Sequence, residues 1–215
     1  MKTELRLLDL YCCAGGCSAG YVDAGFEVVG VDINEQPKYP FSFCRGDAIE
    51  YLLGHWREFD AVHASPPCQQ YSGSTNTWKA AGRTYPELIG PTRQALIACG
   101  LPYVLENVPG APLLNPVLLC GAMFGRPLYR HRMFETSFPL DQPEHPPHAA
   151  PQVKMGRPAK PWEYIQAVGH FSGVPMVRRA MQIDWMGQKE LAQAVPPAYT
   201  RYTGRALIAY LRARQ

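Results

Sequence analysis

Alternating strand-like and helix-like segments at the start of the chain restrict what it can fold into. Leu5 to Tyr11 has the apolar character of a strand, Cys17 to Ala24 indicates a helix that ends at Gly25, and Phe26 to Ile33 is the next strand. A strand, a helix and a strand at this spacing form a parallel pair with a right-handed crossover. The sequence therefore predicts an α/β fold with a Rossmann-like, doubly wound and mostly parallel sheet.

The rest of the chain continues this pattern less regularly. Further strands are predicted over residues 59–64, 117–120 and 133–138, with another that ends at Glu106, and helices over residues 48–56, 87–99 and 200–214. The polar stretch 70–83 predicts a long loop, and long loops in compact domains are usually functional or disordered. Residues 139–161 are rich in Pro and His and predict a loop or linker.

Composition and charge limit the class of protein. The chain has 215 residues, no apolar stretch long enough for a bilayer and no signal-peptide pattern, which predicts a soluble, cytoplasmic protein of one domain. Seven cysteines at irregular spacing favour reduced thiols over a disulfide framework. Residues 154–215 hold ten Lys or Arg and three Asp or Glu, a net charge of +7, against −4 for the first 153 residues. This asymmetry indicates a surface that faces a polyanion, or a solvated helix face.

Two reactive side chains follow strands of the predicted sheet. Cys68 comes directly after Pro66-Pro67 at the exit of the strand at 59–64, and Glu106 ends a later strand. Buried strands rarely tolerate Pro, so the segment predicts a shaped turn that exposes the thiol. Ligands of open α/β sheets bind at the carboxyl ends of the strands. A sulfur nucleophile and an acid that stabilises the resulting charge can therefore meet over one substrate.

The first turn and the second strand suggest a cofactor site. Ala14-Gly15-Gly16 lies between strand and helix, where glycines let a ligand approach the backbone and the helix N-terminus faces it. Asp32, at the end of the next strand, can accept hydrogen bonds from a ribose diol. The turn lacks GxGxxG, and Cys13 stands where a glycine is expected, which favours a nucleoside cofactor over a pyrophosphate. The pattern alone leaves nicotinamide, flavin and S-adenosylmethionine (SAM) open.

The order of short motifs resembles the cytosine-5 DNA methyltransferases. The motifs run from about residue 5 to residue 210 and read DLYCCAGGCSAGY, VDINE, GDAIE, SPPCQQYS, LENVPG, YRHRMFE and AQAVPPAYTRYTG. The resemblance implies a class I SAM-dependent methyltransferase that methylates DNA, as in the restriction-modification systems of bacteria or phage. It implies a SAM-binding catalytic domain at 1–138, a reduced, Pro-rich recognition region at 139–181, and a C-terminal helical segment at 182–215 that packs back on the catalytic domain.

The resemblance also assigns the residues that carry the chemistry. Cys68 is the nucleophile, Glu106 hydrogen-bonds the cytosine ring, and Asn107 supports its loop. Arg132, with Arg130 beside it, lies near the exocyclic oxygen of the base and near the nucleophile. Such chemistry favours a Glu106 pKa raised by burial and a Cys68 pKa lowered by cations, with Arg132 the first candidate. The residues after Cys68 resemble a mobile loop that closes over the flipped base.

The expected contacts to SAM come from four parts of the chain. The first turn faces the methionine part, Asp32 or Glu35 holds the ribose, Ile33 packs on the adenine, and Asp47 takes its amino group. The full set of predicted cofactor residues is Asp9, Tyr11, Ala14, Gly15, Gly16, Asp32, Ile33, Glu35, Asp47, Ala48 and Pro66.

Departures from the family pattern leave the substrate open. The first glycine of the FxGxG turn is missing, Leu128 replaces the first residue of QxRxR, and the recognition region is far shorter than the family's. DNA with a cytosine flipped from the stack is the first substrate hypothesis; RNA and a free cytosine nucleotide are alternatives, as is a non-catalytic module that binds SAM or nucleic acid. The intact Cys68, Glu106 and Arg132 argue against the last. Specificity is expected to be short, about two base pairs, or supplied by a protein partner.

No metal site is predicted from the sequence. His145 and His148 form an HPPH pair in the Pro-rich segment, but no paired cysteine accompanies them at the usual ligand spacing.

Overall fold

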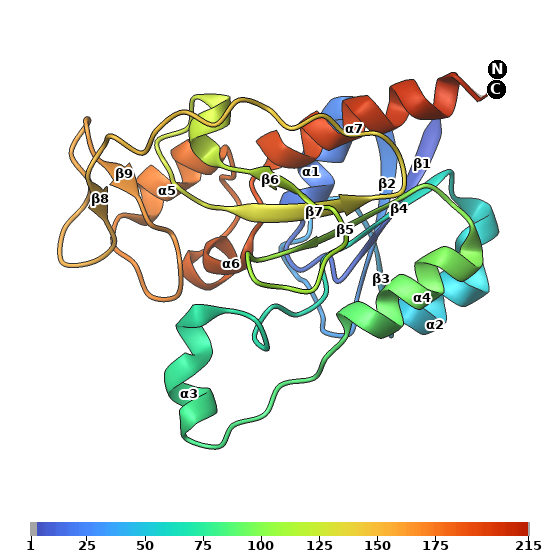
Figure 1. Cartoon of the computed structure of the whole chain (residues 1–215), viewed down its shortest axis with the longest axis horizontal. Helices are drawn as coiled ribbons and strands as arrows, with labels where there is room; N and C mark the ends of the chain where they lie inside the picture. Colours follow the sequence, from blue (N-terminus) through green and yellow to red (C-terminus); the bar gives the residue numbers. More distant parts are fainter. Residues whose placement is uncertain (1–3, 215) are drawn as a thin grey trace.

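Seven strands form one sheet in the computed structural model, which describes residues 4–214 (Figure 1). Their order across the sheet is β3-β2-β1-β4-β5-β7-β6; β1 to β5 are parallel, and β7 runs antiparallel to both of its neighbours. The strands are β1 (Leu5–Leu10), β2 (Phe26–Asp32), β3 (Ser42–Arg45), β4 (Ala61–Ala64), β5 (Tyr103–Asn107), β6 (Val117–Leu119) and β7 (Arg132–Thr136). The predicted doubly wound, mostly parallel sheet is confirmed.

Helices cover both faces of this sheet. On one face lie α1 (Gly16–Ala24) and α7 (Pro197–Arg212), and on the other α2 (Ala48–His55) and α4 (Ile89–Cys99). Close packing of α1 on α7 depends on two glycines that lack a Cβ. A Cβ on Gly20 would lie 2.1 Å from the Pro197 carbonyl oxygen, and one on Gly204 would lie 2.9 Å from Ala24. Helix α1 ends at Gly25, which adopts φ 112°.

The C-terminal half adds a third apolar cluster beside the sheet. It joins α5 (Val174–Met181) and α6 (Gln188–Gln193) with buried Leu128, Ile165 and Phe171. A two-stranded sheet pairs β8 (Gln152–Val153), inside the segment predicted as a loop or linker, with β9 (Tyr164–Ile165), which follows that segment. The sequence did not predict β3, α5 or α6.

The remaining elements are short. Helix α3 (Asn76–Ala80) follows a 3-10 turn (Gly73–Thr75) inside the stretch predicted as a long loop, and it stands clear of the sheet in Figure 1. Two further 3-10 turns cover Trp56–Glu58 and Gly121–Phe124. Among the residues described, no helix combines the length and the apolar character that crossing a membrane demands.

The strand order sets the place of the site. Chain connections run in opposite directions from the neighbouring strands β1 and β4, and such a switch point opens a crevice at the carboxyl ends of the strands. The segments that follow β1, β2, β4 and β5 therefore meet at one edge of the sheet.

A buried ion pair fastens α4 to the antiparallel part of the sheet, and we expect its loss to be costly. Arg93 donates to both carboxylate oxygens of Glu135 at 2.9 and 2.7 Å, and the Tyr103 hydroxyl and the Leu114 N–H donate to the same carboxylate. Arg93→Ala would leave this buried charge without its cation and should lower the free energy of unfolding by about 3 kcal/mol. Urea unfolding measures the loss.

A surface pair provides the control for that measurement. Lys38→Ala removes an ion pair to Glu190 in which both side chains reach solvent, so we expect a loss of less than about 1 kcal/mol. Equal losses for the two variants would contradict the importance assigned to burial.

Candidate active site

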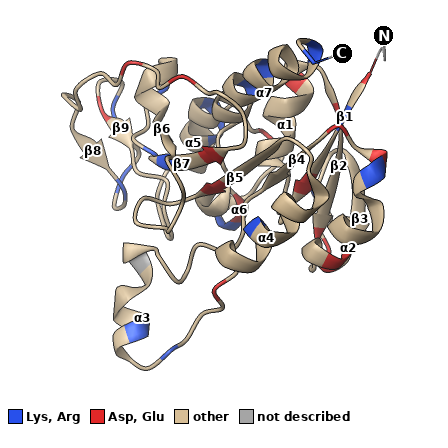
Figure 2. Ribbon diagram, turned by 45° about the vertical axis from the view of Figure 1, so that its right-hand side comes forward, with Lys and Arg blue, Asp and Glu red and all other residues tan. Residues whose placement is uncertain are grey.

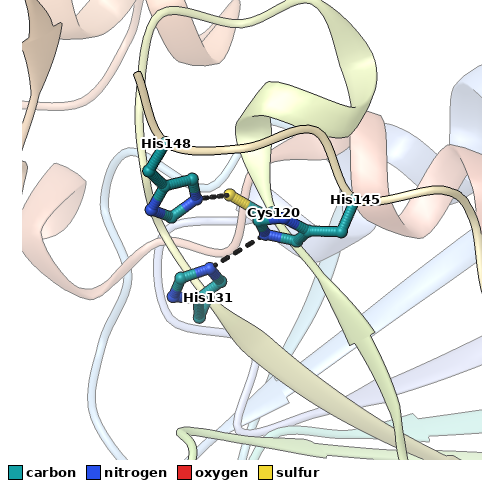
Figure 3. Close-up of side chains that lie close together, drawn as sticks. All are labelled: Cys120, His131, His145 and His148. Atoms are coloured by element: carbon teal, nitrogen blue, oxygen red, sulfur yellow. Dashed lines mark hydrogen bonds between the residues drawn. The ribbon is translucent and has the colours of Figure 1, made fainter. Parts of the chain in front are cut away.

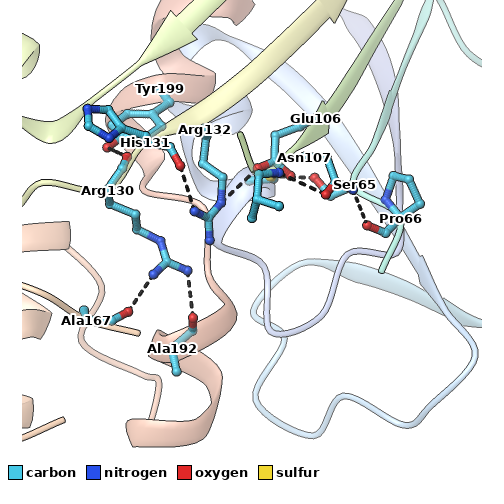
Figure 4. A network of polar contacts seen from close by, with 12 residues as sticks. Ser65, Pro66, Glu106, Asn107, Arg130, His131, Arg132, Ala167, Ala192 and Tyr199 are labelled. Carbon is cyan, nitrogen blue, oxygen red and sulfur yellow. Dashed lines mark hydrogen bonds and ion pairs between the residues drawn. The ribbon is translucent and has the colours of Figure 1, made fainter. Parts of the chain in front are cut away.

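The pairing of β4, β5 and β7 brings three predicted site residues together. Cys68 follows β4 through Ser65-Pro66-Pro67, and Glu106 lies near the end of β5. Glu106 pairs directly with Phe134 of β7, so Arg132, two residues earlier on β7, lies diagonally across the same face. Arg132 Nε consequently lies 3.1 Å from Glu106 Oε1 (Figure 4).

Glu106 is a buried carboxyl with an unused acceptor. It is 4% exposed, and burial raises its pKa, although Arg132, a hydrogen bond from Ser65 and Arg130 act in the opposite direction. The contact with Arg132 is an ion pair without hydrogen-bond geometry, and Oε1 accepts no hydrogen bond from any described residue. The predicted upward shift is confirmed, and the carboxyl can bind a polar group of a ligand.

The pKa of the Cys68 thiol is raised, whereas the sequence analysis expected it to be lowered. Burial raises this pKa, and the opposing charges of Arg132 and Arg130 do not compensate for the burial and for the nearby Glu106. The prediction of a lowered pKa is therefore wrong for this state, although Arg132 is the largest lowering influence, as expected. A thiolate here requires a change in its surroundings, such as a bound cationic ligand.

Asn107 joins the two segments that carry Cys68 and Glu106. Its side-chain amide donates to the Pro66 carbonyl at 2.8 Å, and its side-chain oxygen accepts from the Val108 N–H at 2.9 Å. Both bonds are buried, so the turn after β4 is held to the end of β5.

A buried chain of polar groups beneath Glu106 was not predicted. The Tyr21 hydroxyl contacts His63 Nδ1 at 2.9 Å, His63 Nε2 contacts the Ser65 hydroxyl at 2.8 Å, and Ser65 bonds to Glu106. Burial lowers the pKa of His63 to about 3, so the imidazole is neutral. The signal in the sequence was a histidine inside the apolar strand, followed two residues later by a serine.

Arg130 holds the chain that follows the Pro-rich segment. Its guanidinium is buried and donates to the Ala167 carbonyl at 2.6 Å and to the Ala192 carbonyl at 2.8 Å (Figure 4). Its own carbonyl accepts from the Tyr199 hydroxyl at 2.6 Å. Unlike Arg132, Arg130 forms no ion pair with Glu106, and its hydrogen bonds serve the architecture of the site.

The turn after β1 is fastened to the end of β2. Asp32 Oδ2 accepts from the Cys13 N–H at 3.1 Å, and Oδ1 accepts from the Asn34 N–H at 2.9 Å. Cys13 adopts φ 46°, so it stands in the left-handed conformation that the expected glycine would favour. Glu35 lies farther out, where its exposed carboxylate pairs with Arg45 at 3.4 Å.

The two glycines of this turn leave space that other segments of the same chain occupy. A Cβ on Gly15 would lie 3.1 Å from the Tyr39 ring, and one on Gly16 would lie 2.6 Å from the Val195 carbonyl oxygen. The neighbouring Ala14 carbonyl accepts from Trp185 Nε1 at 2.7 Å. Chain segments near residues 39, 185 and 195 thus close around the turn.

The other predicted cofactor residues differ in access. Asp47 caps α2, where its Oδ1 accepts from Ile49 and Glu50, so Oδ2 remains available to a ligand; Ala48 is buried in the first turn of that helix. Ile33 is 64% exposed at the end of β2, an unusual position for a large apolar side chain.

Asp9, on β1, and Tyr11, directly after it, face inward instead. The Tyr11 hydroxyl shares a hydrogen bond of 2.8 Å with Thr92. Asp9 is fully buried beneath α1, where the Ser18 hydroxyl donates to Oδ2 and no described residue donates to Oδ1. Asp9 can therefore act on a ligand only through Ser18 and helix α1.

Asp9 gives a testable dependence of stability on pH. Burial raises its pKa to about 7, so the folded protein keeps a proton that the unfolded chain releases near the ordinary value of 3.8. This contribution to stability is present at low pH and is lost as the pH rises towards 7, by about 1 kcal/mol per pH unit. Asp9→Asn cannot ionise, so its stability relative to wild type should rise across this window in urea unfolding. A difference that does not change with pH would contradict the assignment.

Comparison with known proteins identifies the fold. No family model matches the sequence, and no curated protein matches it. The Entamoeba histolytica methyltransferase EhMeth aligns with a TM-score of 0.60 at 13% identity, over 98% of this chain and 99% of its own. The S. pombe Dnmt2 methyltransferase aligns with a TM-score of 0.56 at 13% identity, over 99% of both chains. The fold is that of the class I SAM-dependent methyltransferases.

A third solved structure overlaps with only part of its length. The mutant DNMT2 of Spodoptera frugiperda aligns at 19% identity with a TM-score of 0.45, over 66% of this chain and 54% of its own, so this chain spans about half of that protein.

Proposed function

We propose that this protein transfers a methyl group from SAM to carbon 5 of cytosine in DNA through a covalent adduct with Cys68. The observation that carries the proposal is the convergence of Cys68, Glu106 and Arg132 at the edge of a methyltransferase sheet. Burial raises the pKa of Glu106, which suits an acid that must donate a hydrogen bond.

The residues at the ends of β1 to β3 fit SAM as the cofactor. The exposed Ile33 offers an apolar surface for the adenine, and Asp47 has a free carboxylate oxygen for its amino group. Asp32 lies beside the first turn and can still accept from a ribose hydroxyl, whereas Glu35 is exposed and paired with Arg45. We therefore assign the ribose to Asp32. SAM supplies an electrophilic methyl group on a sulfonium.

The chemistry follows from the weak nucleophilicity of cytosine carbon 5. The Cys68 thiolate adds to ring carbon 6, and the electron pair of the 5,6 double bond becomes available at carbon 5 for the methyl group. Protonated Glu106 donates to ring nitrogen 3 and stabilises the charge that develops there. A base then removes the proton from carbon 5, which restores the 5,6 double bond and expels the Cys68 thiolate.

Arg132 and the positive cofactor promote the thiolate in this scheme. Arg132 is the strongest influence that lowers the pKa of Cys68, and a sulfonium nearby would act in the same direction. The buried chain from Tyr21 through His63 and Ser65 keeps Glu106 in place.

Two features favour DNA over a free nucleotide: the positive charge of the C-terminal third, and the segment 70–83, here called the arm, which carries α3. Residues 154–215 hold a net charge of +7, and arginines lie along α7 in Figure 2. The arm comes shortly after Cys68 in the chain, and its helix α3 stands clear of the sheet in Figure 1; its Trp78 is exposed and can stack on a base. Unstacking a cytosine costs a few kcal/mol, which contacts from the arm can offset. RNA presents the same charge and remains the alternative, and a short target or a protein partner supplies specificity.

Cys68→Ser should abolish methyl transfer and leave SAM affinity nearly unchanged, because Cys68 lies apart from the turn after β1. The assay offers labelled SAM with duplex DNA, single-stranded DNA, RNA or dCMP, and calorimetry measures SAM binding. Cys44→Ser, on β3, serves as the matched thiol control. Turnover by Cys68→Ser would remove this residue from the nucleophile role. Labelling of RNA or dCMP in preference to DNA would replace the proposed substrate.

Binding of DNA should weaken steeply with salt, because lysine and arginine contacts to phosphate release counterions. Arg179 is exposed, whereas Arg178 donates to the Met186 carbonyl at 2.8 Å. Arg179→Glu should therefore reduce affinity for every sequence and lower the salt slope by about 1 or 2. Fluorescence anisotropy over a range of salt measures both, with Arg57→Glu, an exposed arginine in the 3-10 turn after α2, as control. A flat dependence on salt would contradict a polyanion substrate.

A further inference from the structure

Three imidazoles and one thiol meet where the Pro-rich segment crosses the edge of the sheet. Cys120 directly follows β6, His131 directly precedes β7, and His145 and His148 come from the Pro-rich segment (Figure 3). One donor atom from each of the four lies within 4.8 Å of the others. Cys120 Sγ is 3.5 Å from His148 Nε2, and His131 Nε2 is 3.1 Å from His145 Nε2.

We propose that these four side chains bind one zinc ion. Zinc in structural sites takes four nitrogen or sulfur ligands in a tetrahedron, and one cysteine with three histidines satisfies that requirement. Typical bond lengths place tetrahedral donors roughly 3.4 Å apart for two nitrogens and roughly 3.6 Å apart for nitrogen and sulfur. The two measured separations lie close to these values.

The surrounding structure holds the ligands in position before an ion binds. The Gln142 side chain bonds to both the N–H and the carbonyl of Leu118 at 2.9 Å, which fixes the segment before His145 to β6. After His148, the Ala150 N–H donates to the Tyr129 hydroxyl at 3.0 Å. The Tyr129 ring also stacks on the His148 ring, with centroids 3.6 Å apart.

Two prolines reduce the freedom of the segment further. Pro146 and Pro147 separate His145 from His148, and their fixed φ angles limit the conformations that the pair can adopt. Both histidines are exposed, yet His148 contacts the thiol of the buried Cys120 and His145 contacts His131 (Figure 3). The sequence interpretation that this pair lacks a cysteine partner is wrong, because Cys120 reaches it from β6.

The ion would have an architectural role. Four protein ligands leave no open position for a substrate, which is the arrangement of structural zinc. His131 stands between Arg130 and Arg132, so the ion would fix the start of the strand that carries both arginines. It would also anchor the Pro-rich segment to the sheet, so that this segment would need no larger domain to hold it in place.

Metal content of the purified chain tests the proposal without any assay of methyl transfer. We expect about one zinc ion per chain by elemental analysis, and a visible spectrum of a tetrahedral cobalt thiolate after exchange with Co²⁺. Cys120→Ser and the double variant His145→Ala/His148→Ala should each reduce bound zinc at least about tenfold. Cys44→Ser and His55→Ala, which lie outside the cluster, should keep it.

Two results would overturn the proposal. One is a wild-type chain that holds no zinc after purification without chelators and shows no cobalt thiolate spectrum when Co²⁺ is added. The other is zinc retained by the double variant, which would place the ion elsewhere, such as at the buried group of Asp9, Cys17 and His63. The double variant changes exposed side chains, so it decides the matter even if Cys120→Ser does not fold; circular dichroism confirms its fold.

Discussion

The antiparallel pairing of β7 with β5 is the constraint on which the candidate site depends. It sets Phe134 opposite Glu106 and so brings Arg132 within 3.1 Å of the Glu106 carboxyl. A shift of one residue in this register would turn Arg132 to the other face of the sheet and leave the buried carboxyl without its cation. Asn107 then holds the segment of Cys68 to the same strand end. The strand register, more than any loop, brings the three groups together.

Burial determines the electrostatics of this site. It raises the pKa of both Glu106 and Cys68, so burial in the structure without ligands shifts both groups towards their neutral forms, a protonated acid and a thiol. The first state suits donation of a hydrogen bond to a ring nitrogen. The second changes only when positive charge joins Arg132 near the sulfur. Under the proposed function, such a site would stay unreactive until its cofactor is bound, which would link activation of the thiol to the presence of the methyl donor.

Local patterns in the sequence were enough to predict most strands of the sheet, though not β3, and the positions of Cys68 and Glu106, because strand periodicity and the double proline act over a few residues. The sequence did not show why position 16 needs a glycine, because the Val195 carbonyl that occupies the space of a Cβ lies far along the chain. The meeting of Cys120 with the HPPH segment was hidden for the same reason. Helices α5 and α6 were missed because they are short, and a shared apolar cluster holds them in place. Interactions between distant segments are what single-sequence patterns do not contain.

Trapping the adduct tests the central claim most directly. A duplex that contains 5-fluorocytosine cannot lose a proton from carbon 5, so an enzyme that adds sulfur to carbon 6 stays attached to the DNA. Peptide mass spectrometry after incubation with SAM should find the nucleotide on the peptide that contains Cys68, with the methyl group already transferred. Omission of SAM should prevent the stable product. Absence of any adduct, or its attachment to one of the other six of the seven cysteines, would contradict the account.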